Sequence, residues 1–347
     1  MKRGMRRGIE KEQKEGPWKE EDWSGKGFSS FPNPPDLNLA SITKLDLSRN
    51  GLKSIPESAM ARLLNLVELD LHSNQLTSLP NSIGCLSKLR RLDVSGNLLP
   101  FLPKTIEACK GLEALLANFN EITCLPDTIG QSLPKLRLLS VHSNKLIYLP
   151  HTTHKLTSLR TLDAHLNCLV ALPNDLHLLP LLAFVDVRHN FNHLRSLPDS
   201  IGLLPSLAHL NISYNSISSL PDSLACAAAL CTLRAEGNPL VSPPLDVVAN
   251  GVDATRGYLI GRINGESKKR GRAAWFGGLA RCGTFGFRSR MGHRKIRTQE
   301  GEEDEGLVDR DYRSIDGLAT PSRLETGGLS PYRFFSLQPS TPPRAWK

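Results

Sequence analysis

This sequence has few aromatic residues, no regular cysteine pattern and no long apolar run. Aromatic residues make up 6% of the 347 residues, so aliphatic side chains must fill any core. The seven cysteines form no paired framework, which argues against a disulfide-stabilised secreted domain. No apolar run approaches the ~20 residues of a membrane helix, and the N-terminal stretch MKRGMRRGIEKEQKEG is too charged for a signal peptide. We expect an intracellular, cytoplasmic protein, with the inner face of the plasma membrane and the nucleus as open alternatives.

Motifs for catalysis and for metal binding are also missing. The sequence has no phosphate-binding G-x-x-x-x-G-K-[ST] loop, no kinase motif set and no G-x-S-x-G nucleophile turn. No cysteine stands in a Cys-x-Asp context that would mark it as a nucleophile. The close Cys and His spacings of zinc sites are absent as well. We therefore expect no enzymatic activity, no cofactor and no bound metal.

Asparagine, in contrast, recurs at a nearly constant interval through most of the chain. Successive members of the series are 24, 23, 23, 24, 23, 23, 25 and 23 residues apart. A fixed period of this length is typical of a solenoid built from stacked repeats. The series consists of Asn50, Asn74, Asn97, Asn120, Asn144, Asn167, Asn190, Asn215 and Asn238.

Each repeat follows the pattern L-x-x-L-x-L-x-x-N-x-L-x-x-L-P, most cleanly at residues 66–80, and this is the leucine-rich-repeat signature. The L-x-L step predicts a short strand with leucines on one face and variable residues on the other. The Asn amide is expected to turn inward and to satisfy backbone groups of the turn, and Leu-Pro predicts entry into a short outer segment. The predicted fold is an α/β leucine-rich-repeat solenoid, or horseshoe, with a parallel concave sheet, short helical or irregular convex segments and disordered tails.

The chain divides into five predicted parts. Residues 1–17 form a charged, disordered N-terminus, and residues 18–41 form a degenerate repeat that caps the solenoid. Residues 42–244 are the leucine-rich repeats, and residues 245–264 form a helical C-terminal cap. Residues 265–347 form a mostly disordered tail that is first basic and then acidic.

Two local irregularities carry further expectations. The 25-residue step after Asn190 places Leu194 two positions late, so we expect a local bulge there. Within the cap, Gly251 and Gly257 argue against one unbroken helix.

Several stretches resemble the plant intracellular Ras-group-related leucine-rich-repeat (LRR) proteins. They include LNLASITKLDLSRN at 37–50, LPNSIGCLSKLR at 79–90, and EGNPLVSPPL at 236–245 followed by GVDA at 251–254. The resemblance covers roughly residues 36–264. It implies a scaffold or adaptor that binds other proteins in intracellular signal transduction, with a small GTPase or a signalling enzyme as partner. It implies no catalysis.

The variable residues six, four, two and one positions before each repeat asparagine should line the concave face in columns, because neighbouring strands lie ~4.8 Å apart. One column is acidic, and the next is rich in histidine. The candidate partner-binding residues are Arg49, Asp70, His72, Asp93, Leu116, Phe119, His142, Asp163, His165, Asp186, Arg188 and Tyr214.

Alternative interpretations of this face stay open. It is either a polar groove that binds a folded or peptide partner, or a solvated sheet surface without a partner. Leu116 and Phe119 form either an exposed apolar anchor or, for Phe119, inward packing. His142 and His165 fall near carboxylates, but without a dense ligand cluster we expect them to be solvated histidines.

The tail contains the second notable pattern. Residues 268–297 hold ten Lys or Arg and no acidic residue, interleaved with aromatic residues. Such a segment binds an anionic membrane weakly, binds RNA without sequence specificity, or is simply solvated. The alternative to a concave-face scaffold is therefore a peripheral membrane adaptor attached through this tail. No specific nucleic-acid partner is expected.

Overall fold

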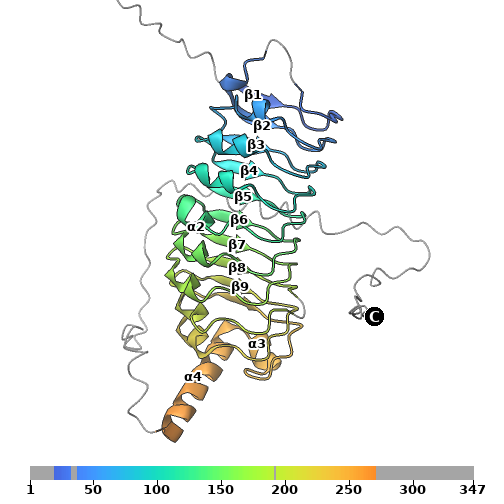
Figure 1. Ribbon diagram of the computed structural model, residues 1–347. Coiled ribbons are helices and arrows are strands. Elements are labelled where there is room, and N and C mark those ends of the chain that lie inside the picture. Colours follow the sequence, from blue (N-terminus) through green and yellow to red (C-terminus); the bar gives the residue numbers. More distant parts are fainter. Residues whose placement is uncertain (1–18, 33–36, 191–192, 271–347) are drawn as a thin grey trace, which may run out of the picture. The chain divides into compact units, whose positions relative to one another are not determined.

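The computed structural model describes residues 19–32, 37–190 and 193–270, with side chains described up to Gly265. These residues form a single stack of repeats in which one parallel sheet runs along one side and short helices run along the other (Figure 1). No helix in these ranges combines the length and the apolar content that crossing a bilayer requires.

Ten strands pair in strict chain order, each parallel to the next. They are only three to five residues long because the L-x-L step is followed at once by a turn. Their bounds are β1 Lys19–Asp22, β2 Ile42–Asp46, β3 Glu68–Asp70, β4 Arg91–Asp93, β5 Ala114–Leu116, β6 Leu138–Ser140, β7 Thr161–Asp163, β8 Phe184–Asp186, β9 His209–Asn211 and β10 Thr232–Arg234.

The outer segments are single helical turns, mostly 3₁₀ helices. Most follow the Leu-Pro step directly, with the proline at the N-cap, as Pro80 and Pro103 illustrate. The bounds are η1 Leu39–Ser41, α1 Glu57–Met60, η2 Asn81–Cys85, η3 Lys104–Ala108, α2 Ile129–Ser132, η4 His151–Lys155, η5 Asn174–Leu178, η6 Ile201–Leu203 and η7 Asp222–Cys226. Proline suits this position because its fixed φ fits the extended N-cap backbone and its missing N–H lies outside the helical hydrogen bonds.

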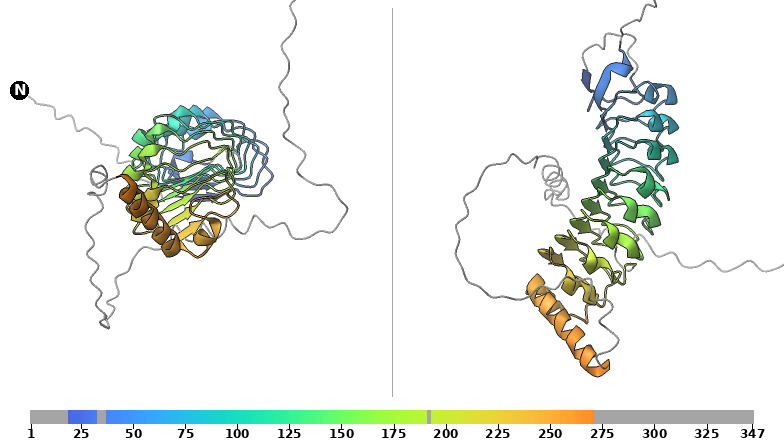
Figure 2. Two further views of the ribbon diagram at one scale, coloured as in Figure 1. Left: turned by 90° about the horizontal axis from the view of Figure 1, so that it is seen from below. Right: turned by 90° about the vertical axis from the view of Figure 1, so that its left-hand side faces the viewer.

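The core is a continuous column of aliphatic side chains between the sheet and the outer segments. Leu69 and Leu71 of one repeat are 1% and 0% exposed, and the corresponding residues from β2 to β9 are equally buried, whereas Leu233 of β10 is half-buried. Figure 2 shows the two layers from the end and from the side of the stack. Each repeat buries its leucines against its neighbours, so no repeat has a core of its own.

The repeat asparagines form a ladder that links each repeat to the one before it. Asn74 shows the pattern: its Oδ1 accepts the backbone N–H of Leu52 at 3.1 Å, and its Nδ2 donates to the carbonyls of Leu47 and Leu71 at 2.9 and 3.0 Å. Asn97, Asn120, Asn144, Asn167 and Asn238 make the equivalent contacts. The amide thus satisfies buried turn groups that have no ladder partner.

The ladder changes at the irregular repeat. Asn215 Oδ1 accepts the backbone N–H of Asn190 itself, at 2.8 Å, rather than that of a residue two positions later. Leu194, which the insertion displaces in sequence, is nevertheless fully buried. Residues 191–192, where we expected the bulge, lie outside the described residues.

The stack is closed at both ends. At the start, β1 pairs with β2, and Trp23 packs edge-on against Phe31 at 6.1 Å between ring centroids. At the other end lie α3 (Leu245–Ala249) and α4 (Val252–Arg270), separated at Gly251. Gly257, the other glycine expected to break the helix, lies inside α4, which continues six residues past the expected boundary at 264.

Arg262 fastens α4 to the last repeat. Its guanidinium contacts Asp222 at 2.5 Å, the Ser242 hydroxyl at 2.7 Å and the Leu220 carbonyl at 2.8 Å. Residues 1–18 and 271–347, including nearly all of the basic segment and the acidic cluster after it, lie outside the described residues.

Candidate protein-binding face

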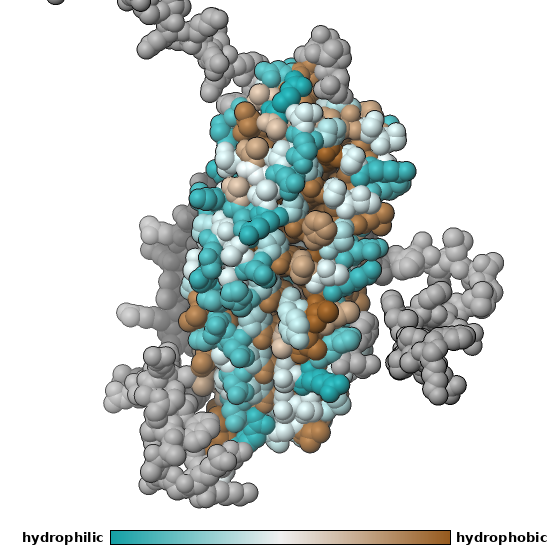
Figure 3. Space-filling view, in the orientation of Figure 1, coloured by the Kyte–Doolittle hydropathy of each residue, from teal (hydrophilic) through white to brown (hydrophobic). Residues whose placement is uncertain are grey.

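The exposed side of the sheet brings like positions of successive repeats together. The strand pairing aligns Asp70 with Asp93 between β3 and β4, and Asp163 with Asp186 between β7 and β8. The predicted columns are therefore present. Among the described residues, the helices lie on the opposite side and leave this face uncovered (Figures 1 and 2). The space-filling view of Figure 3 shows brown, hydrophobic atoms interspersed with hydrophilic ones along the stack.

Near the start of this face, Asp70 and His72 form a local pair. The two residues flank Leu71, so both side chains point to the same side of the sheet, and Nδ1 of His72 lies 2.8 Å from Oδ1 of Asp70. This hydrogen bond raises the pKa of His72 despite partial burial. Asp93, one strand further on, is 9% exposed, and burial together with the Asp70 charge raises its pKa.

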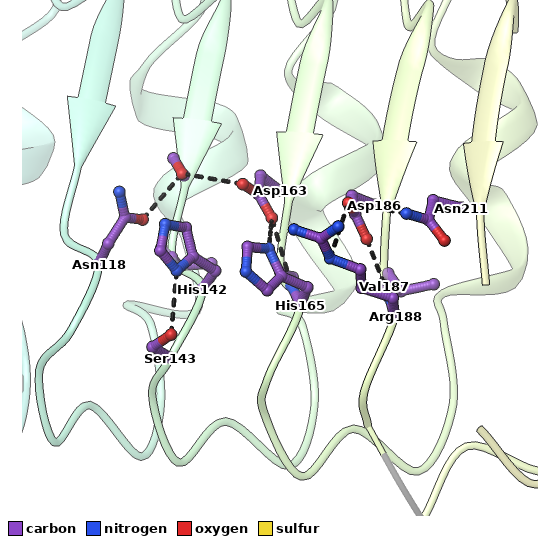
Figure 4. A network of polar contacts seen from close by, with 12 residues as sticks. Asn118, His142, Ser143, Asp163, His165, Asp186, Val187, Arg188 and Asn211 are labelled. Atoms are coloured by element: carbon purple, nitrogen blue, oxygen red, sulfur yellow. Dashed lines mark hydrogen bonds and ion pairs between the residues drawn. The ribbon is translucent and has the colours of Figure 1, made fainter. Parts of the chain in front are cut away.

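The middle of the face carries a buried polar network (Figure 4). Ser140 donates to Asn118 Oδ1 at 2.8 Å and lies 3.5 Å from Asp163 Oδ2. Oδ1 of Asp163 in turn bonds Nδ1 of His165 at 2.6 Å. The network therefore runs from Asn118, two residues past β5, across to β7. Ser140 and Asp163 occupy the same repeat position, and Asn118 and His165 occupy the position two residues later.

The network continues on β8. Asp186 is fully buried, with Arg188 Nε 3.5 Å from one carboxylate oxygen and the Asn211 amide at 3.2 Å. Burial and the nearby Asp163 charge raise the pKa of Asp186 to about 6. Burial also acts to raise the pKa of Asp163, but its contacts with His165 outweigh this and lower it.

The expectation that these histidines are solvated is wrong. His142 and His165 are 1% and 7% exposed, and Asp163 is 2% exposed. The two histidine rings stack at 4.2 Å between centroids, and the Phe119 ring lies perpendicular to the His142 ring at 4.9 Å between centroids. Because neighbouring strands lie only ~4.8 Å apart, side chains in one column bury one another even on an open sheet face. Burial lowers the pKa of His142 to about 4, so its imidazole is neutral at pH 7.

Two clusters bring possible metal ligands together, which sequence spacing did not indicate. They are Asp70, His72 and Asp93, and Asp163, His165 and Asp186, with ligand atoms within 4.8 Å of one another in each. In both clusters the histidine Nδ1 already bonds the aspartate two residues before it. In the second cluster, Arg188 also contacts Asp186. These contacts account for the geometry without an ion.

The predicted Leu116 and Phe119 pair is only half correct. Leu116 is 4% exposed, because its short strand packs between its two neighbours, so it is not part of an exposed anchor. Phe119 is 54% exposed, so the alternative that it packs inward is also wrong. Arg49 and Tyr214 occupy the same repeat position as Phe119, and both are exposed.

This repeat position, directly before the ladder asparagine, has a left-handed backbone throughout the stack. Its φ values lie between 50° and 70°. The residues are Arg49, Ser73, Gly96, Phe119, Ser143, Leu166, His189, Tyr214 and Gly237. Sequence reasoning missed Leu166 and His189 as surface residues, although their shared offset from the asparagine was a usable signal.

The sequence and the architecture agree with known repeat proteins. The family model described as leucine rich repeat matches residues 40–99 and 190–240. A solved structure of a leucine-rich-repeat protein from Leptospira interrogans superposes with a TM-score of 0.61 at 33% identity, covering 68% of this chain and 59% of that one. The chain has the leucine-rich-repeat solenoid fold that its sequence predicted.

Two curated relatives refine this placement. Plant intracellular Ras-group-related LRR protein 1 of Oryza sativa subsp. japonica is 52% identical over 108 residues, which are 31% of this chain and 29% of the relative. Plant intracellular Ras-group-related LRR protein 8 of Arabidopsis thaliana is 47% identical over 102 residues, 29% of this chain and 25% of the relative. The resemblance to this group is thereby confirmed, over less than a third of each relative's length.

Proposed function

We propose that this chain is a non-catalytic interaction protein that binds other proteins through the concave face of its sheet. The observation that carries the proposal is the ten-stranded sheet. Its concave face, opposite the outer helical segments, is not covered by any described element. Half-exposed and exposed side chains such as Leu138, Arg188 and His209 lie on that face. A rigid surface of this kind presents a fixed pattern of contacts to a partner.

A role as scaffold or adaptor in intracellular signalling follows from the relatives, which are named intracellular and Ras-group-related. A small GTPase or a signalling enzyme is the partner class that these names favour. The buried polar network supports this proposal. Side chains that the network holds in place lose little conformational entropy when a partner binds. Attachment to a membrane through the basic tail concerns residues outside the described ranges and stays a sequence-based prediction.

Partner capture with surface variants tests the proposal. Leu138→Glu with His209→Glu alters the concave face at two half-exposed or exposed positions. Lys104→Glu with Lys155→Glu alters exposed residues of η3 and η4 on the opposite side and serves as the matched control. Proteins captured by the wild type and identified by mass spectrometry should be lost from the concave variant and retained by the control. If the concave variant still captures the partners and the control variant does not, the partners bind the opposite side of the stack.

A further inference from the structure

The turn position before the ladder asparagine carries an unusual set of side chains in the middle of the stack. Phe119, Leu166, His189 and Tyr214 occupy it there, and we call these four residues the turn ridge. Three of the four are exposed apolar or aromatic residues, at 54%, 38% and 49% for Phe119, Leu166 and Tyr214.

Folding alone does not require large residues at this position. A left-handed backbone is strained for a non-glycine residue, and bulky side chains tolerate it poorly. The same position holds Gly96 and Gly237 in other repeats, and Ser73 and Ser143 in two more. The fold thus accepts small residues here, yet the ridge places large apolar ones in solvent.

Neighbouring groups hold part of the ridge rigid. The Tyr214 ring stacks on His189 at 4.5 Å with an interplanar angle of 2°. On its other side lies Gly237, where an added Cβ would come within 2.5 Å of the ring. Phe119 packs against His142 with the two rings nearly perpendicular. Preorganised aromatic side chains of this kind are effective binding anchors, because little conformational entropy is lost on contact.

The charge beside His189 in the ridge is positive, whereas the exposed Glu236 lies next to Tyr214 at one end of the ridge. Arg188, next to His189, contacts Asp186 through Nε, and its two terminal nitrogens make no hydrogen bond to a described residue. The concave aspartates of these repeats, Asp163 and Asp186, are buried and already engaged. The partly exposed Arg188 guanidinium beside His189 therefore complements a carboxylate.

We propose that the turn ridge and Arg188 form a recognition strip for an extended peptide segment of a partner protein, in which an acidic side chain is flanked by large apolar ones. The strip crosses five consecutive repeats, so it spans ~20 Å, which matches about six residues of extended chain. The acid pairs with the Arg188 guanidinium, and the apolar side chains pack on Phe119, Leu166 and Tyr214. This inference rests on the proposed function and specifies which part of the face binds.

A peptide library tests the inference on the full chain. Phage displaying random peptides of about 12 residues are selected on the wild-type protein, and enriched peptides are synthesised for Kd measurement by fluorescence polarisation. We expect enrichment of Asp or Glu flanked by Phe, Trp, Tyr or Leu. The triple variant Phe119→Ser, Leu166→Ser, Tyr214→Ser introduces the residue that this chain itself uses at Ser73 and Ser143, so it should fold with an unchanged circular dichroism spectrum.

The variants have distinct expected effects. The triple variant should raise the Kd about 100-fold, because large exposed anchors carry most of such binding energy. Phe101→Ser with Tyr148→Ser is the control, since these residues are equally exposed, at 54% and 63%, and lie outside the ridge; its Kd should stay within about 2-fold. Arg188→Gln should weaken an acidic peptide about 10-fold and leave the peptide's amide version unchanged.

Three results would overturn the assignment: no peptide that prefers wild type over the triple variant, equal losses in the control, or no dependence on the acid. Failure of the ridge remains separable from failure of the proposed function, because Leu138 and His209 lie outside the ridge. If those two substitutions abolish partner capture and no selected peptide depends on the ridge, the concave face remains the binding site and the ridge assignment is wrong.

Discussion

Substituting His142 or Asp186 with asparagine should change the pH dependence of stability in opposite directions. Both side chains are buried in the polar network, at 1% and 0% exposure. Burial lowers the pKa of His142 from 6.5 to about 4 and raises the pKa of Asp186 from 3.8 to about 6. Both shifts favour the neutral form of the group, but one neutral form has lost a proton and the other has kept it.

The sign of each effect follows from proton linkage. Folded His142 releases a proton that the unfolded chain binds, so its contribution is present above pH 6.5 and is lost as the pH falls through about 4. Folded Asp186 keeps a proton that the unfolded chain releases, so its contribution is present below pH 3.8 and is lost as the pH rises through about 6. At 1.36 kcal/mol per pKa unit, each contribution is about 3 kcal/mol.

In the wild type, the pH dependences of the two contributions nearly cancel between about pH 4 and 6. Each variant removes one of the two contributions. Relative to wild type at the same pH, His142→Asn should lose about 3 kcal/mol of unfolding free energy as the pH rises from 4 to 6.5. Asp186→Asn should gain about 3 kcal/mol over the same range, and the double variant should show little slope.

Urea unfolding followed by circular dichroism at several pH values measures these differences directly. Comparing each variant with wild type at the same pH removes the contribution of other titrating groups, such as His72. If both differences are independent of pH, the two side chains titrate normally, and the buried network does not exist in solution as described.

Other predictions concern stability. Gly202→Ala should cost at least about 2 kcal/mol, because the added Cβ would lie 2.0 Å from the Ser223 carbonyl oxygen, whereas Gly257→Ala in open space on α4 should stabilise by about 0.5–1 kcal/mol. Chemical denaturation of the two variants compares a crowded glycine with a free one. Asn144→Ala should cost about 3 kcal/mol by stranding buried backbone groups, with faster hydrogen exchange in the two adjoining turns. Arg262→Ala should cost about 1–2 kcal/mol and increase hydrogen exchange first in α4; uniform exchange along the stack would contradict its role as a local fastener.

The repeat architecture could be predicted from sequence because its determinants are periodic. The leucines and asparagines recur at fixed offsets, so one repeat defines the strand, the turn and the outer segment of all the others. The register of the columns followed as well, since equal offsets place Asp163 beside Asp186. The same pattern located Leu194 two positions late, and the structure shows that this residue is buried.

Burial on the open face could not be predicted in the same way. The alternation of L-x-L indicates which side a residue faces, but not how deeply its neighbours cover it. His142 is buried because Phe119 and His165 lie on either side of it, and that depends on side-chain size in adjacent repeats. Likewise, the left-handed turn is a property of the backbone, so the offset of Leu166 from the asparagine gave its repeat position but not the exposure of its side chain.

The asparagine ladder has a direction that bears on how the protein is made. Asn74 bonds to groups of the repeat that precedes it as well as to its own turn. In a chain that grows from its N-terminus, each new asparagine therefore completes a turn that has already been synthesised. Only the most recently synthesised repeat lacks the asparagine of the repeat that follows it. The stack is therefore expected to assemble repeat by repeat in the order of translation, with α4 packing on its end last.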